Sequence, residues 1–144
     1  MRVAAVIAAA CLALAGCSMF GDDDEPAAAG GEVAPAQLHV PVDAVRHIEF
    51  GRTRDGIVIT AIGVAPGLGY SMPELRARRE GRPGPDGYLD FDFVARQPDP
   101  GLALGEGTVQ ARTVRADLHL KISELQGARG LRVHGISGGL QADF

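Results

Sequence analysis

Cysteine, tryptophan and long apolar runs are all scarce in this chain. Each shortage excludes certain ways of stabilising or anchoring the fold. Its two cysteines are Cys11 and Cys17. No disulfide can therefore form within the chain beyond residue 17, and a fold there must depend on its apolar core. Tryptophan is absent and aromatic residues make up 5% of the chain. That core must therefore consist mainly of Val, Leu, Ile and a few Phe side chains.

The chain also lacks an excess of charge over most of its length. The formal net charge is −4, yet five of the acidic residues and only one basic residue, Arg2, lie before position 37. Residues 37–144 are consequently balanced. A balanced segment without interleaved basic and aromatic residues does not have the pattern of a nucleic-acid-binding domain, so no nucleic acid is expected as a partner.

The apolar run near the start, Val3 to Ala15, is shorter than the roughly 20 residues that a membrane-spanning helix needs. It follows Arg2 and ends in small residues. This order is typical of a secretory signal peptide, so we interpret residues 1–16 as a signal peptide that is removed.

The next residues place a thiol at the end of this run. Leu14-Ala15-Gly16-Cys17 resembles the lipobox of bacterial lipoproteins. The resemblance implies that diacylglycerol is attached to the Cys17 thiol, that signal peptidase II cuts before Cys17, and that a further fatty acid such as palmitate acylates the new amino group. In such lipoproteins Asp after the cysteine retains the protein in the inner membrane, so Ser18 favours the outer membrane and a periplasm-facing domain. The alternative is an ordinary signal peptide with an incidental cysteine.

Residues 17–36 are rich in Ala, Gly, Pro and acidic side chains. Such a segment cannot bury enough apolar surface to offset the entropy lost on ordering. It therefore predicts a lipidated Cys17 followed by a disordered tether, in which the acidic run Asp22–Glu25 is solvated.

Residues 37–144 show apolar residues at every second position, interrupted by Gly and Pro about every ten residues. This spacing predicts an all-β domain, a small antiparallel β-sandwich of the immunoglobulin-like kind with about seven or eight strands. We expect the strands around Ile48–Phe50, Ile57–Val64, Pro73–Glu80, Leu89–Arg96, Val114–Ile122, Leu131–Ile136 and Leu140–Phe144.

A hairpin is expected where two of these runs flank a turn-rich stretch at Gly81–Gly87. Antiparallel pairing with partner numbers that sum to 168 places Leu75 opposite Phe93 and Ala77 opposite Phe91 on the inward face. A shift of one residue would turn charged side chains into the core, so the pattern favours this register.

The same register brings arginines beside carboxylates on the outer face. It pairs Arg76 with Asp92 and Arg78 with Asp90, so the cluster of four arginines is interpreted chiefly as paired surface charge. The alternative is a patch for anionic partners such as lipopolysaccharide. The cluster consists of Arg76, Arg78, Arg79 and Arg82.

Two histidines are the candidate metal ligands. If the runs Val114–Ile122 and Leu131–Ile136 form a hairpin, His119 faces His134 and the pair could bind copper or zinc. A zinc site needs at least three protein ligands, however, so the interpretation we favour is two histidines without a metal. No cofactor is expected.

A catalytic constellation is not evident. Gly135-Ile136-Ser137-Gly138-Gly139 matches G-x-S-x-G, but no histidine follows Ser137 and no strand-to-helix turn is expected there. We therefore expect no enzyme. The sequence favours a non-enzymatic, lipid-anchored envelope module that binds another envelope protein, a polymer or a ligand, and the alternative is a metal-binding or enzymatic periplasmic lipoprotein.

A further resemblance lies inside the β domain. Gly63-x-x-Pro66-x-x-Gly69-Tyr70-x-x-Pro73-x-Leu75 resembles a pattern of small, uncharacterised bacterial envelope lipoproteins. It implies a lipid-anchored β domain and no particular activity.

Replacing Cys17 with Ser tests the lipobox directly. Because a hydroxyl cannot take the place of the thiol, the Cys17→Ser chain should keep its signal peptide and incorporate no radiolabelled palmitate. Normal cleavage and membrane retention of this variant would contradict the lipobox interpretation.

Overall fold

Eight strands and two short 3₁₀ turns form the part of the chain that the computed structural model describes, residues 38–102 and 104–144. The predicted signal peptide and tether, with Cys17, lie outside the described residues. The all-β prediction is confirmed. No helix in the described ranges is long and apolar enough to cross a membrane. The elements are β1 (His39–Pro41), β2 (Ala44–Arg52), β3 (Gly56–Val64), β4 (Ser71–Ala77), η1 (Arg79–Gly81), β5 (Tyr88–Arg96), β6 (Thr113–Lys121), η2 (Ile122–Leu125), β7 (Gly130–His134) and β8 (Gly139–Asp143).

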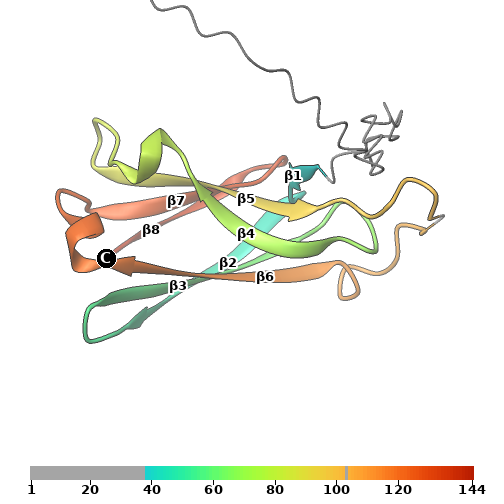
Figure 1. The fold of residues 1–144 in the computed structure, drawn as a ribbon, viewed down its shortest axis with the longest axis horizontal. Coiled ribbons are helices and arrows are strands. Elements are labelled where there is room, and N and C mark those ends of the chain that lie inside the picture. The colour runs from blue at the N-terminus through green and yellow to red at the C-terminus, as the bar shows by residue number, and fades with distance from the viewer. Residues whose placement is uncertain (1–37, 103) are drawn as a thin grey trace, which may run out of the picture. The chain divides into compact units, whose positions relative to one another are not determined.

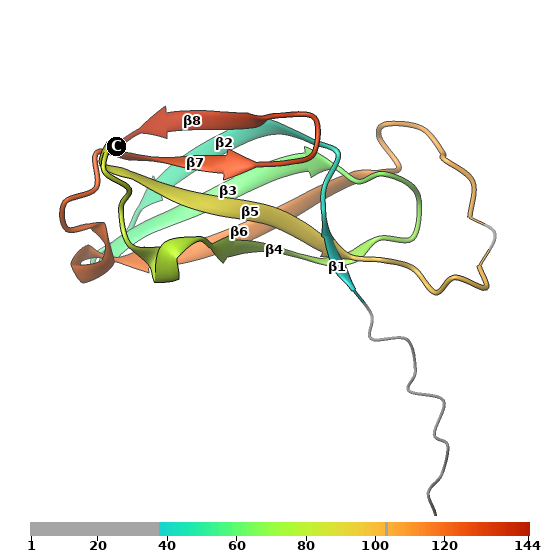
Figure 2. The same cartoon turned by 90° about the horizontal axis from the view of Figure 1, so that it is seen from above.

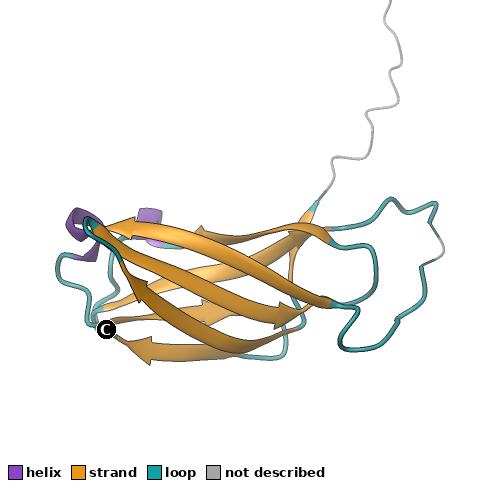
Figure 3. Cartoon of the chain, turned by 90° about the horizontal axis from the view of Figure 1, so that it is seen from below, coloured by secondary structure: helices purple, strands orange, loops and turns teal. Residues whose placement is uncertain are grey.

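The strands form two sheets that pack face to face as a sandwich (Figures 1 and 3). One sheet has the order β2-β3-β6, with antiparallel pairing throughout. The other contains β4, β5, β7 and β8 together with the short β1. The core lies between the sheets, and its largest fully buried side chains are Phe91, Phe93, Ile59, Leu89, Leu131, Val42 and Val133.

Strand β5 is the centre of the larger sheet. Val94 and Arg96 are each paired with both β1 and β4, so these two strands lie on opposite edges of β5. Phe91 and Asp92 are each paired with both β4 and β7, so β7 lies on the same edge as β1. This one edge is therefore shared, with β7 beside the first half of β5 and β1 beside the second half.

The pairing of β5 with β7 is parallel, in a sandwich whose other strand pairs are antiparallel. The expected hairpin between Val114–Ile122 and Leu131–Ile136 is therefore wrong. η2 and the segment after it carry the chain from one sheet to the other, so β6 pairs with β3 while β7 pairs with β5 and β8.

The hairpin between β4 and β5 has the register that the sequence predicts. Leu75 is paired with Phe93, Arg76 with Asp92, and Ala77 with Phe91. The expectation that fails is the burial of Ala77, which is exposed. Ala77 ends its strand and lines an opening between β4 and β6, so its inward-facing methyl group is not covered by the opposite sheet.

Two Ala→Asp substitutions, one at a buried and one at an exposed position of the β4–β5 hairpin, test how burial differs along it. Ala95 in β5 is 0% exposed. Ala95→Asp would bury an unpaired carboxylate and should destabilise the domain by about 3–5 kcal/mol or prevent folding. Ala77→Asp leaves the new charge in water and should cost about 1 kcal/mol or less. Urea unfolding followed by circular dichroism measures both, and equal effects would contradict this arrangement of β4 and β5.

Candidate functional site

The two candidate metal ligands lie in different sheets. His119 in β6 places Nε2 3.3 Å from Asp55 Oδ1 and 3.2 Å from Thr53 Oγ1. His134 in β7 places Nε2 2.9 Å from Asp90 Oδ1. In the described part of the chain, no group of three or more His, Cys, Asp or Glu side chains is arranged to hold a metal ion. The expected pairing of His119 with His134 is wrong because it depended on the hairpin that does not form.

Each arginine of the predicted patch has a carboxylate partner, although the pairs differ from those expected. Arg78 contacts Asp92 at 2.5 Å rather than Asp90, and Arg79 reaches Asp90 at 2.6 Å. Arg76 pairs with Glu74 on its own strand rather than with Asp92. Arg82 is the most exposed of the four, with Glu80 at 3.4 Å. Paired surface charge therefore accounts for the cluster.

Asp90 is the one charged residue among the described residues that is buried on the outer face of the larger sheet, where its side chain is 8% exposed. Arg79 and His134 donate hydrogen bonds to its two oxygens, and Arg132 lies 3.9 Å from Oδ1. Burial alone raises the pKa of Asp90, but the hydrogen bonds from His134 and Arg79 outweigh it, so the pKa lies below its ordinary value. Asp90 is therefore held as a carboxylate.

Arg79 reaches Asp90 from an uncommon backbone conformation. Arg79 has a φ of 50° and Glu80 a φ of 55°, in the left-handed region that non-glycine residues rarely adopt. Each such residue costs about 1–3 kcal/mol, which the surrounding contacts must offset. The bond from Arg79 to the buried carboxylate is one contact that holds this turn.

Tyr88 extends the same polar network toward β8. The guanidinium carbon of Arg132 lies 4.4 Å from the centre of the Tyr88 ring, and that of Arg129 lies 5.2 Å from it. The Tyr88 hydroxyl donates a hydrogen bond to Asp143 at 2.7 Å, and this bond raises the pKa of Tyr88. Arg132 also contacts Asp86. The outer face is therefore a largely self-neutralised network that stabilises the sheet.

Ser137 of the G-x-S-x-G match lies in the turn between β7 and β8. Its hydroxyl donates a hydrogen bond to Asp43 Oδ1 at 2.6 Å, with no histidine between them. This contact joins the turn to the segment between β1 and β2. It is a structural hydrogen bond and not the serine–histidine pair of a hydrolase.

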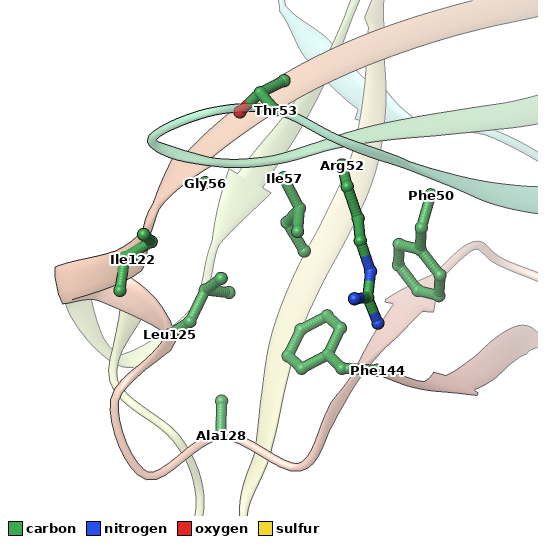
Figure 4. A pocket seen from close by; sticks show the side chains of 9 residues that line it. All are labelled: Phe50, Arg52, Thr53, Gly56, Ile57, Ile122, Leu125, Ala128 and Phe144. Atoms are coloured by element: carbon green, nitrogen blue, oxygen red, sulfur yellow. The ribbon is translucent and has the colours of Figure 1, made fainter.

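A pocket of about 530 Å³ opens at one end of the sandwich (Figure 4). Its volume lies within the range of small-molecule sites in proteins, about 300–1,000 Å³. The ends of β2 and β3, η2, the segment after η2 and the end of β8 form its walls. Phe50 and Phe144 meet edge to face, with ring centres 5.5 Å apart. The lining residues are Phe50, Arg52, Thr53, Gly56, Ile57, Ile122, Leu125, Ala128 and Phe144; we call this the end pocket.

Among the residues that the structure describes, Arg52 is the only charged one that lines the end pocket. Figure 4 shows its side chain extending beside Phe50, with the guanidinium directed toward Phe144. Unlike the arginines of the outer face, Arg52 has no ion pair or side-chain hydrogen bond to another described residue. The pocket therefore combines an apolar wall with one cation that lacks a partner there.

The sequence did not reveal the end pocket. Its residues come from three separate stretches of the chain, 50–57, 122–128 and 144, and Phe50 and Ile57 fit the alternation of ordinary strands. One signal was available: Ile122, Leu125 and Ala128 recur every third position from the end of the expected strand Val114–Ile122 into the connection that follows it. A connection surrounded by water does not need three regularly spaced apolar side chains.

Comparison with known proteins adds no identity. The chain matches no protein-family model, no curated protein and no solved structure.

The charged network makes a prediction about pH. The carboxylate form of Asp90 is favoured in the folded state, so its contribution to stability is present above the unfolded pKa, about 3.9, and is lost as pH falls through the folded value. Asp90→Asn should therefore cost about 1–3 kcal/mol at pH 7, and this cost should shrink as pH falls below about 4. Urea unfolding at several pH values measures it.

Glu106→Gln is the control, because Glu106 lies exposed in the loop between β5 and β6. Its effect on stability should be small at every pH. A cost of Asp90→Asn that stays constant down to pH 3 would contradict the role assigned to the Asp90 carboxylate.

Proposed function

We propose that this protein is a non-enzymatic, lipid-anchored module of the bacterial envelope that binds an apolar ligand in its end pocket. The proposal combines the lipobox at Cys17 with the one observation that carries the binding function: a pocket of ligand size whose wall is built largely from apolar side chains. By the resemblance of Leu14–Cys17 and by Ser18, the anchor is in the outer membrane and the domain faces the periplasm.

The exposure of the pocket residues supports a binding role. Ile122 is 61% exposed and Phe144 is 45% exposed, although both lie beside a partly buried apolar cluster. Apolar side chains that gather around an opening leave surface whose removal from water is favourable. A bound apolar ligand would cover that surface.

The position of the end pocket also suits a tethered module. The first described residues lead into β1, at the end of β5 where Arg96 lies, whereas the end pocket lies at the opposite end of the sandwich (Figure 2). The nine residues of β3 between these ends span about 30 Å. A domain held through its N-terminal segment would thus have its pocket far from the point of attachment.

Two isoleucines of similar exposure provide a matched test. Ile122 lines the end pocket at 61% exposure, and Ile136 lies at the other end of the sandwich at 64%. In a Cys17→Ser background, which lacks the acylated thiol, the neutral fluorescent probe N-phenyl-1-naphthylamine should bind saturably. Ile122→Lys should weaken probe binding about tenfold or more, equivalent to about 1.4 kcal/mol, because a lysine then enters the apolar wall.

Ile136→Lys should leave the probe affinity unchanged. Any probe bound by residues 1–16 contributes equally to both variants, so the comparison reports the end pocket alone. Equal probe affinity in the two variants, or no saturable binding in either, would overturn the proposed function.

A further inference from the structure

We infer that the ligand of the end pocket is a single-chain fatty carboxylate whose head group binds the Arg52 guanidinium. The inference rests on the proposed function and adds a chemical class to it. It comes from the contrast between one unpaired cation and the apolar side chains around it.

The first step is the state of Arg52 without a ligand. Arg52 is exposed, and its guanidinium extends along the apolar side chains of the end pocket without an ion pair to a described carboxylate. Arg79 and Arg132 on the outer face, by comparison, each contact a carboxylate within 2.6 Å. Among the described residues, no carboxylate forms an ion pair with Arg52. Its N–H donors are therefore available to an anionic group of the ligand.

The second step is the number of polar groups that the ligand can have. Besides Arg52, the one polar side chain in the lining is that of Thr53. Its hydroxyl is already engaged, at 3.2 Å from both Asp55 Oδ1 and His119 Nε2. A ligand with several polar groups would leave some of them unpaired in the pocket, which is costly. One anionic group on an otherwise apolar body fits the lining.

The third step is the choice of anion. Arginine presents two parallel N–H donors that match the two oxygens of a carboxylate. The side chains of Phe50, Ile57 and Leu125 offer an apolar wall for an unbranched chain. The neighbouring opening between β4 and β6 holds about 240 Å³ and is lined by two carboxylates, Glu80 and Glu124, together with His119, so it is less suited to an anion. Of these two openings, the end pocket is therefore the one whose lining charge suits an anionic amphiphile.

Matched ligands and matched variants test the inference. Dodecanoate and dodecanol share one chain length and differ in charge. Arg52 and Arg54 are both exposed, but only Arg52 lines the pocket, whereas Arg54 lies in the turn between β2 and β3. Isothermal titration calorimetry on the Cys17→Ser chain, below the micelle concentration, gives the affinity of each ligand for the parent chain, Arg52→Gln and Arg54→Gln.

The expected result is that dodecanoate binds the parent chain about tenfold more tightly than dodecanol, and that Arg52→Gln removes this preference while Arg54→Gln keeps it. The preference should also decrease as salt is raised, because ions screen the pair. Residues 1–16 are common to all variants and cannot produce the difference between them.

The outcomes distinguish the proposed function, binding of an apolar ligand, from the further inference that this ligand is a fatty carboxylate. Equal binding of dodecanoate and dodecanol, unchanged by Arg52→Gln, would overturn the fatty carboxylate and leave the apolar-ligand function standing. Tighter binding of a lysophospholipid with the same chain would overturn the choice of a simple carboxylate. Absence of binding by any of these ligands, together with failure of the neutral probe, would overturn both.

Discussion

The sharing of one edge of β5 by two strands is the constraint on which the rest of this sandwich depends. Because β7 occupies the first half of that edge, β1 has room for only three residues beside the second half. The chain must then leave the sheet, and Val42 and Asp43 carry it to β2 in the opposite sheet. Backbone hydrogen bonds from Val42 to Phe93 and from Asp43 to Val64 connect this crossing to both sheets. Because β1 and β7 share one edge of β5, the chain crosses to the other sheet at Val42 and Asp43. This crossing links the two sheets without a disulfide.

Local pairing was predictable from the sequence, and long-range pairing was not. The register of Leu75 with Phe93 follows from alternation on both sides of a short turn, because a shift by one residue would bury charge. The same alternation in β6 is compatible with any partner strand. Nearness in sequence suggested β7, whereas η2 carries the chain away to the other sheet. Alternation shows which face of a strand is apolar and leaves its neighbour undetermined.

The partners of the polar residues could likewise be predicted only in part from the sequence. The sequence indicated that arginines and carboxylates would meet on the outer face, but it assigned Asp90 to a solvated pair with Arg78. The structure makes Asp90 the buried centre of a network, because the parallel partner β7 brings His134 and Arg132 to it. That juxtaposition, like the end pocket, depends on segments that are distant in sequence, and no periodicity within one strand encodes it.

The shortness of β1 has a mechanical consequence. If the protein is held through its N-terminal segment, a pulling force enters the domain at β1, whose ladder with β5 covers only His39, Val40 and Pro41. Two backbone hydrogen bonds flank this ladder, from Gln97 to Leu38 and from Val42 to Phe93, so few bonds hold β1 in place. Under load β1 would detach first, while β2 remains held by the longer ladder along β3 in the other sheet. The fold thus contains a short extensible link that yields before the walls of the end pocket are disturbed.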